Sequence, residues 1–482
     1  MNIRLILHLL SSILLVEGAA MAPSLALALI YGDGDAMAFV NSMVVTIGVA
    51  LPFRLFAKPK ERMLRAREGF LVVSLVWILM SISGALPFIF SGIIPNFIDA
   101  FFEAVSGFTT TGASIMTVFD GQPRGVMFWR SFTHWIGGMG VLVLTLALLP
   151  TMSARASHLM RAESPGPSLS KIVPKLGDSA KILYIMYGVL TVAQWTLLML
   201  AGMNPYDAAI HAMGTAGTGG FSNYGASIAA FDSALIDAII TFFMVLFGIN
   251  FALFYRVITG GWRDALRSEE LHWYLSIFGG ATLLITVMLI PRYESFFTSL
   301  RYASFQVATI MSTTGYATAD YNLWPVATKM ILFILMFMGS CAGSTAGGMK
   351  TIRVSILIKQ AVQEVRHTFN TRKVQVIRFE GKAIEAKMLH QITVFAFIYI
   401  ALFLICAFLV SLDGVHDVET NLTASLACIS NIGPGLGGVG PVENFAAYSG
   451  FSKFVLSLLM LAGRLELYPI LMLFHPATWR KS

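Results

Sequence analysis

Charged residues are scarce in this chain of 482 residues, of which only 12% are Asp, Glu, Lys or Arg and 56% are hydrophobic. An average soluble domain carries about twice that charged fraction. The composition therefore excludes an ordinary soluble domain. It indicates an all-α polytopic membrane protein whose apolar helices contact membrane lipid.

Cysteine is rare, and clustered histidine is lacking. Cys341, Cys406 and Cys428 show no paired spacing and fall in or near apolar segments, which argues against a disulfide framework or a cysteine metal site. The nine histidines are scattered, and no nucleophile, base and metal ligands gather in one stretch. The sequence thus predicts neither an enzyme nor a bound cofactor.

Lys and Arg are missing from alternate loops. Residues 31–36, 204–232 and 413–450 contain neither Lys nor Arg. Arg124, Arg292 and Arg301 are exceptions expected on the same side as these loops. Most of the 33 basic residues fall in the opposite set of segments, at Arg4, 54–67, 155–181, 256–267, 350–387 and 480–481. Loops rich in Lys and Arg stay in the cytoplasm. Both termini are therefore expected there, and the net charge of +7 reflects topology rather than nucleic-acid binding.

A Thr/Gly run recurs four times at intervals of roughly a hundred residues, which indicates an internal repeat. The copies are Thr109-Thr110-Thr111-Gly112-Ala113, Gly217-Thr218-Gly219-Gly220-Phe221, Thr313-Thr314-Gly315-Tyr316-Ala317 and Asn431-Ile432-Gly433-Pro434-Gly435. Gly112, Gly219, Gly315 and Gly433 are taken as equivalent. A single run would be an ordinary turn, but four copies in matched surroundings favour one shared structure.

Each run follows a stretch too short to span a membrane, so we expect a re-entrant pore helix there. Its capping residue is predicted as Asp99, Asp207, Ser299, and Asp417 or Glu419. Glycine would let the following segment run extended with carbonyl groups facing a monovalent cation. The predicted filter, with potassium as the only metal bound, comprises Thr110, Thr111, Gly112, Gly217, Thr218, Gly219, Thr313, Thr314, Gly315, Asn431, Ile432 and Gly433.

The predicted fold is four helix–pore helix–helix units around one ion pore, preceded by two extra transmembrane helices. The N-terminal pair occupies 1–68, and the units occupy 69–178, 179–270, 271–384 and 385–482. The long helices are expected at Ile3–Ile30, Met37–Phe56, Gly69–Phe90, Val126–Leu149, Ala180–Ala201, Ala234–Val257, Leu271–Ile290, Met388–Val410 and Phe451–Phe474, and Arg372–Arg378 is expected to form a hairpin.

In the third unit, a helix from Leu323 is predicted to stop after Met338 and to resume over Lys350–Phe369. The glycine-rich stretch between them cannot form a stable helix interior. It is not a phosphate-binding loop, because Met349 separates its last glycine from the lysine. An unwound segment at membrane depth borders a cavity, so we expect a gate loop that includes Gly339, Gly343, Ser344, Thr345, Gly347, Gly348 and Lys350. The alternative is rigid close packing between helices.

Arg464 lies deep in the last apolar segment, where an ionisable side chain indicates a function. Glu466 is not expected to pair with it, because residues two apart on a helix point to different faces. We interpret Arg464 as a cation barrier in the pore below the filter. The alternative is a structural pairing with another helix or with carbonyl groups of the 339–349 loop.

Together these motifs resemble the Trk/Ktr/HKT superfamily of potassium transporters, and in particular its bacterial TrkH branch. The finer likeness lies in the sequences Arg-Ala-Glu-Ser-Pro-Gly-Pro at 161–167, Gly-Ser-Thr at 343–345 and Gly-Arg-Leu-Glu at 463–466. Ala346 and Thr218 depart from the pattern of that branch. The resemblance implies a homodimer in the bacterial inner membrane and a cytosolic ring of nucleotide-binding TrkA-type subunits that regulates opening.

The predicted function is channel-like potassium uptake. The alternative, Na⁺- or H⁺-coupled symport, would need a relay of ionisable groups, yet the apolar segments hold little beyond Glu17, Glu103, Asp237 and Glu466. Glu103 is expected as an outer-mouth charge rather than as a coupling site.

Overall fold

The computed structural model of this chain describes residues 2–57, 59, 66–140, 176–369 and 376–479. Its α-helices are α1 (Ile3–Ala20), α2 (Ala22–Tyr31), α3 (Ala36–Phe56), α4 (Ala66–Phe90), α5 (Phe97–Phe108), α6 (Arg124–Gly138), α9 (Leu176–Leu200), α10 (Pro205–Gly217), α11 (Ala234–Phe247), α12 (Phe251–Ile258), α13 (Trp262–Leu266), α14 (Glu269–Tyr293), α15 (Phe296–Met311), α16 (Val326–Met336), α17 (Thr351–Phe369), α18 (Ala386–Ser411), α19 (Val418–Ser430), α20 (Gly450–Arg464) and α21 (Tyr468–Phe474). Two short strands, β1 (Arg378–Phe379) and β2 (Lys382–Ala383), form an antiparallel hairpin.

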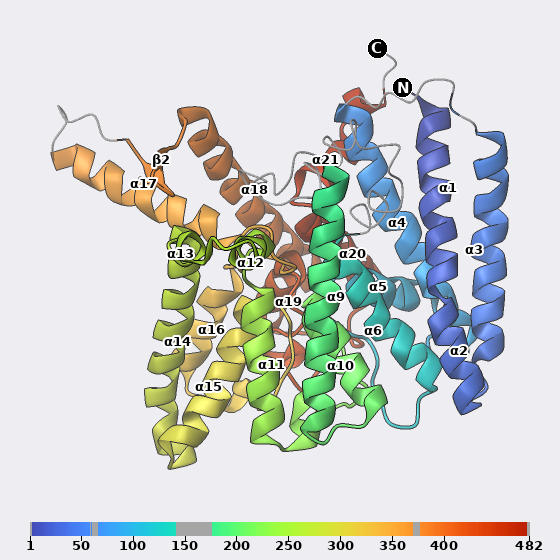
Figure 1. The fold of residues 1–482 in the computed structure, drawn as a ribbon, viewed down its shortest axis with the longest axis horizontal. Coiled ribbons are helices and arrows are strands. Elements are labelled where there is room, and N and C mark those ends of the chain that lie inside the picture. The colour runs from blue at the N-terminus through green and yellow to red at the C-terminus, as the bar shows by residue number, and fades with distance from the viewer. Residues whose placement is uncertain (1, 58, 60–65, 141–175, 370–375, 480–482) are drawn as a thin grey trace.

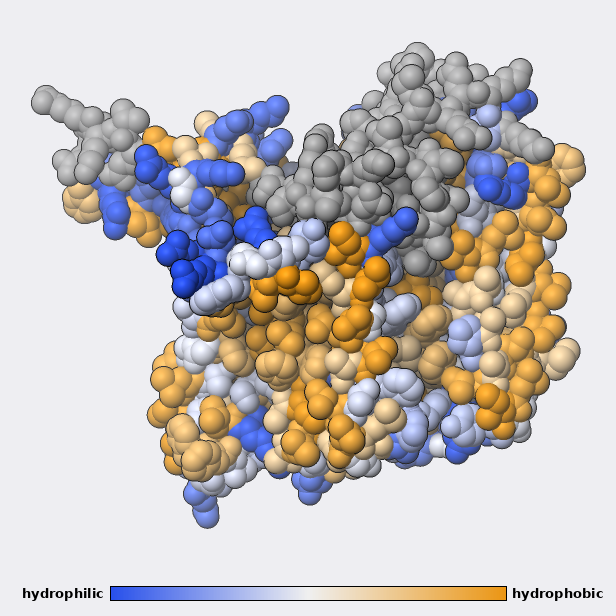
Figure 2. All heavy atoms as spheres, viewed as in Figure 1, coloured by the Kyte–Doolittle hydropathy of each residue, from blue (hydrophilic) through white to orange (hydrophobic). Residues whose placement is uncertain are grey.

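The predicted all-α membrane fold is confirmed. Six helices in the described ranges are long and apolar enough to cross a membrane, and the bent pair α11–α12 is a seventh candidate. Figure 2 shows hydrophobic side chains over the middle band of the visible face, with hydrophilic ones gathered toward its upper and lower margins. The two termini lie on the same side of the molecule (Figure 1).

Most predicted long helices are present, with differences at their breaks. The helix expected at Ile3–Ile30 bends at Met21, just before Pro23, and becomes α1 and α2. For the helix expected at Val126–Leu149, α6 ends already at Gly138, followed by Gly140 with a positive φ of 74°, and residues 141–149 lie outside the described residues. The hairpin lies just after the range Arg372–Arg378 in which it was expected, of which residues 372–375 are also outside the described part.

Two helices predicted to be continuous are broken, and both predictions are wrong. Ala234–Val257 bends by 92° between α11 and α12. Gly248 lies there against Tyr274, and Asn250 caps α12 by accepting the Ala252 N–H. Phe451–Phe474 breaks after Arg464, because Pro469 cannot donate a helical hydrogen bond and Leu467 takes a left-handed φ of 69°. The break expected in the third unit is present between α16 and α17.

The four pore helices are present as α5, α10, α15 and α19, and they are 12, 13, 16 and 13 residues long. Asp417 caps α19 as expected, but the other caps lie one turn earlier than predicted, at Asn96, Asn204 and Ser295. Asp99 and Asp207 instead fall in the first turn, where a carboxylate complements the positive end of the helix dipole.

The units close into a ring through the helix that follows each filter run. This helix packs against the next pore helix in every case: α6 against α10, α11 against α15, α16 against α19, and α20 against α5. The N-terminal helices lie outside the ring, where α1 and α3 pack against α4. The C-terminal ends of the pore helices therefore face a shared centre, while the unit limits in sequence stay a prediction.

Candidate functional site

The four Thr/Gly runs adopt one backbone conformation. In each, a residue with φ of 55° or 56° ends the pore helix, at Thr110, Thr218, Thr313 and Asn431. A glycine with positive φ follows two residues later, at Gly112, Gly220, Gly315 and Gly433. The equivalent glycine of the second unit is therefore Gly220, so the sequence alignment that used Gly219 was wrong by one residue. Gly217 is the last residue of α10, and Thr218 matches Thr110 and Thr313.

These glycines and the carbonyl groups between the four strands form a closed ring. A Cβ placed on Gly112 would lie 2.0 Å from the Gly219 carbonyl oxygen, and one on Gly220 would lie 2.0 Å from that of Thr314. A Cβ on Gly315 would lie 2.2 Å from the Ile432 carbonyl oxygen, and one on Gly433 would lie 2.7 Å from the Thr111 carbonyl oxygen. Each strand therefore contacts the next, and the fourth contacts the first. Four equivalent carbonyls at one level are the arrangement that can replace the hydration shell of a monovalent cation.

A cavity of about 650 Å³ lies beside this ring on the face away from the two termini, and a second of about 270 Å³ lies directly on the ring. The smaller cavity is lined by Gly112, Gly220, Gly315 and Gly433, so all four strands open into it. Phe119 and Tyr224 line both cavities and separate them. The four strands of the ring therefore open onto the face away from the two termini.

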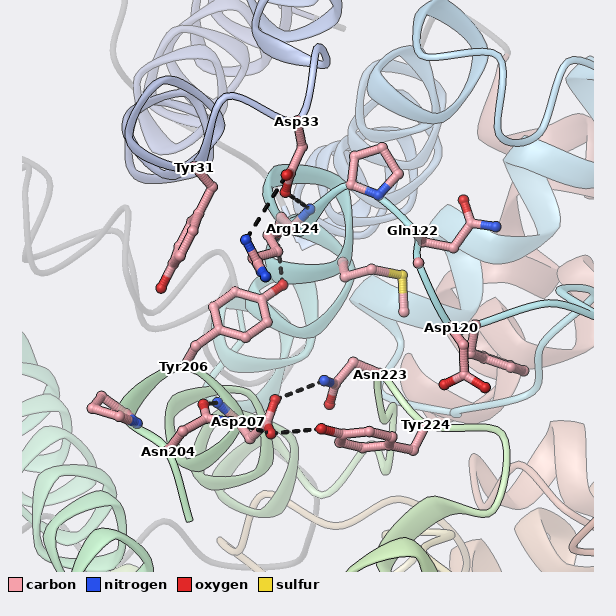
Figure 3. A pocket seen from close by; sticks show the side chains of 15 residues that line it. Tyr31, Asp33, Asp120, Gln122, Arg124, Asn204, Tyr206, Asp207, Asn223 and Tyr224 are labelled. Atoms are coloured by element: carbon pink, nitrogen blue, oxygen red, sulfur yellow. Dashed lines mark hydrogen bonds and ion pairs between the residues drawn. The ribbon is translucent and has the colours of Figure 1, made fainter.

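Asp207 lies in the lining of the larger cavity and binds two residues of the strand beside it (Figure 3). Its carboxylate accepts hydrogen bonds from the Asn223 amide at 2.7 Å and the Tyr224 hydroxyl at 2.8 Å, both on the strand that leaves the second filter run. Nearby, Tyr206 donates to the Arg124 carbonyl, and Arg124 lies close to Asp33, at 3.8 Å between charged groups. The N-terminal helices are thereby attached to the first two units on the outer side.

The glycine-rich loop at 339–349 lies directly against the ring of strands that the sequence predicts to be a filter. The Gly347 N–H donates to the Thr313 hydroxyl at 2.7 Å, and a Cβ on Gly347 would lie 2.5 Å from the Ser430 carbonyl oxygen. Lys350 is buried, and its ammonium group donates to the Ala346 carbonyl. The loop thus packs beneath the third and fourth strands, on the side opposite the outer cavity.

Carbonyl and N–H groups of the loop also form hydrogen bonds with backbone groups at the break between α11 and α12. The Cys341 N–H donates to the Gly248 carbonyl, and the Gly343 carbonyl accepts from the Phe251 N–H, on the two sides of the α11–α12 break. Glu270 accepts from the N–H groups of Ala342 and Ile352, at both ends of the loop. No motif pointed to this role, because Glu270 stands in an ordinary acidic first turn of α14.

Arg464 connects the loop to the first unit. Its guanidinium donates to the Thr345 carbonyl at 2.8 Å and to the carbonyls of Gly137 and Gly138 at 2.6 and 2.9 Å, at the C-terminal end of α6. Glu466 lies within the break between α20 and α21 and accepts from Arg353 at 2.5 Å. Arg464 therefore lies where the loop, the fourth unit and the first unit meet.

Glu103 is not the outer-mouth charge that the sequence indicated. Its side chain is fully buried and pairs with Arg130 at 2.6 Å. The outer acidic residue of this pore helix is Asp99, which pairs with Lys453 of α20 at 2.8 Å. Every residue of α5 from Ala100 to Phe108 is buried, so the helix has no exposed face there that would have distinguished Glu103 from its neighbours.

The chain is similar to known cation transport proteins over its whole length. Residues 35–300 and 296–481 match the TrkH family, described as cation transport protein. The Trk system potassium uptake protein TrkH of Salmonella typhimurium is 36% identical over 97% of each chain, and that of Halomonas elongata is 34% identical over 100% of each. The solved structure of the potassium transporter TrkH from Vibrio parahaemolyticus covers 100% of both chains at 31% identity, with a TM-score of 0.89. The four-strand ring, the broken helices and these similarities together show that the chain belongs to the TrkH family of cation transport proteins.

Proposed function

We propose that this chain carries potassium into the cell through a channel-like pore whose filter is the ring of Thr111, Gly219, Thr314 and Ile432 carbonyls. The closed contact between each glycine and the next strand's carbonyl carries the proposal. Relatives of similar length are named potassium uptake proteins. Carbonyl oxygens in a fixed ring favour a weakly hydrated monovalent cation.

The proposed topology places both termini in the cytoplasm of a bacterium and the outer cavity outside its inner membrane. The absence of Lys and Arg from residues 204–232 and 413–450 supports this orientation. In the proposed assembly, two copies of the chain form a homodimer, and a cytosolic TrkA-type nucleotide-binding ring acts on the gate loop. The Trk system names of the relatives support a multi-component system.

Passive conduction is proposed rather than Na⁺- or H⁺-coupled symport. Three of the four acidic residues that could form a relay are held by separate arginines: Glu103 by Arg130, Asp237 by Arg301, and Glu466 by Arg353. The fourth, Glu17, accepts a hydrogen bond from the Ser83 hydroxyl. Purified protein in planar bilayers under K⁺ and Na⁺ gradients tests both points. We expect a reversal potential close to the K⁺ equilibrium value. A reversal potential that moves with the proton gradient at fixed K⁺ would contradict passive conduction.

Arg464 is proposed to be a cation barrier beneath the filter. The carbonyls of Thr345, Gly137 and Gly138 orient its guanidinium and carry no net charge of their own. Repulsion of a cation is strong at the low effective dielectric of a buried pore. We expect Arg464→Ala to raise K⁺ flux into liposomes by about tenfold, the factor given by about 1.4 kcal/mol of barrier.

Arg464→Lys separates the two interpretations of this residue. Lysine keeps the positive charge but cannot donate to three carbonyls in a fixed fork. Flux near that of the parent supports the electrostatic barrier. Flux as high as that of Arg464→Ala would instead show that the hydrogen bonds to the loop, rather than the charge, hold the pore closed.

A further inference from the structure

A pore-helix side chain holds the strand that leaves the filter in each unit. Two turns before the left-handed residue, Glu103 accepts the Ile115 N–H at 3.0 Å and His211 contacts the Ser222 hydroxyl at 3.0 Å. Gln306 lies at the same position in the third unit and contacts Thr318. In the fourth unit Thr423 accepts the Leu436 N–H at 2.9 Å. The exit strand is thus fixed by the helix that precedes it.

The first unit differs because its side chain is charged and paired. Glu103 also accepts from the Ser114 hydroxyl at 3.0 Å, and its partner Arg130 comes from α6. Arg130 donates to the Ser222 carbonyl at 2.9 Å, and its guanidinium lies 3.5 Å from the centre of the Phe221 ring. One buried ion pair therefore joins the exit strands of the first and second units.

The other junctions between neighbouring strands use neutral hydrogen bonds. Tyr316 donates to the Phe221 carbonyl at 3.4 Å, Asn322 exchanges two bonds with Gly437, and the Phe445 N–H donates to the Ser114 carbonyl. A buried ion pair gives little net stability over a well-packed apolar pair of similar volume. What it provides is rigid, directional bonding, because charge-assisted hydrogen bonds are shorter and stronger than neutral ones.

The pair also lies beside the ion path. Arg130 lines the cavity on the filter, where Glu443 is the other charged residue among those that line it. An unpaired guanidinium there would repel an entering cation. The carboxylate of Glu103 at 2.6 Å offsets that charge while it fixes the strand.

We propose that the Glu103–Arg130 pair is a positioning element of the filter, which sets the separation of the Thr111 and Gly219 carbonyls by clamping their exit strands together. This inference rests on the proposed function of the ring as a potassium filter. The pair touches the strands rather than the ion, so its effect on ion choice passes through backbone geometry.

Removing the whole pair tests the proposal without leaving one buried charge alone. The double variant Glu103→Gln with Arg130→Met keeps side-chain volume and neutralises both groups. We expect its K⁺ over Na⁺ permeability ratio in bilayers to fall by about tenfold, the factor that corresponds to about 1.4 kcal/mol. Arg130→Lys keeps the charge but cannot reach both Glu103 and Ser222, and we expect a smaller fall.

The matched control is the ion pair of Asp237 and Arg301, which is equally short at 2.7 Å and joins α11 to α15. Asp237→Asn with Arg301→Met should lower the thermal stability yet leave the permeability ratio at the parental value. An unchanged ratio in folded Glu103→Gln/Arg130→Met, or an equal fall in the control, overturns the positioning role. A parent that itself shows no preference for K⁺ overturns the filter function instead.

Discussion

Replacing Gly112 with serine is expected to lower the K⁺ over Na⁺ permeability ratio by about tenfold or more, since about 1.4 kcal/mol of lost discrimination gives that factor. Gly112 has φ of 79°, and a Cβ there would lie 2.0 Å from the Gly219 carbonyl oxygen. The strained backbone alone costs about 1–3 kcal/mol. The contact can be relieved only if the carbonyl moves, and that carbonyl is one of the four proposed to replace water around the ion.

Gly121 provides the matched control for this prediction. It has a similar φ of 76° in the outer segment before α6, but nothing lies within 4 Å of a Cβ built on it. Gly121→Ser should therefore carry a comparable backbone strain and leave the ion preference at the parental value. Equal permeability ratios for folded Gly112→Ser and the parent would show that the ring does not select the ion. Reversal potentials measured in bilayers with K⁺ on one side and Na⁺ on the other decide between these results.

Deleting residues 343–345 is expected to raise K⁺ flux into liposomes by about tenfold or more, because the loop that packs beneath the filter would be shortened and released. The deletion removes the Thr345 carbonyl that accepts from Arg464 and the Gly343 carbonyl that accepts from the Phe251 N–H. The filter strands keep their own contacts in the ring. The permeability ratio should therefore stay near the parental value while the flux rises.

A substitution within the same loop separates occlusion from general disturbance. Ser344→Ala removes the bond from this hydroxyl to the Cys341 carbonyl but keeps the loop length. We expect its flux to match the parent. If the deletion lowers flux in protein that elutes as a single folded species, the loop is a rigid packing element, as small residues between membrane helices commonly are.

The repeat could be predicted from sequence because each unit carries its own local signals. The length of the apolar segments predicts the spanning helices, and the recurring Thr and Gly residues predict the filter runs. The register of the second run was ambiguous, because Gly217, Gly219 and Gly220 all stand in one stretch of five residues. The backbone decides it, since the left-handed residue is Thr218 and the glycine two positions later is Gly220.

One unpredicted break, between α11 and α12, lies where distant parts of the chain contact the helix. Gly248 is a single glycine in an apolar segment, and Tyr274 and Ser340 leave no space for a side chain at this position. The burial of Glu103 likewise depends on Arg130, which arrives from the next helix. Local propensity contains neither fact, because tertiary contacts routinely override it.

The way the 339–349 loop completes the ends of other helices has a consequence for the kinetics of opening. To leave its place the loop must break its hydrogen bonds to the Gly248 carbonyl, the Thr313 hydroxyl and the Arg464 guanidinium together. Each group left without a partner at membrane depth costs free energy, so partly released loops are poorly populated. Single-molecule currents should accordingly switch between discrete closed and conducting levels, with open times set by how fast those bonds re-form rather than by graded movement of the loop.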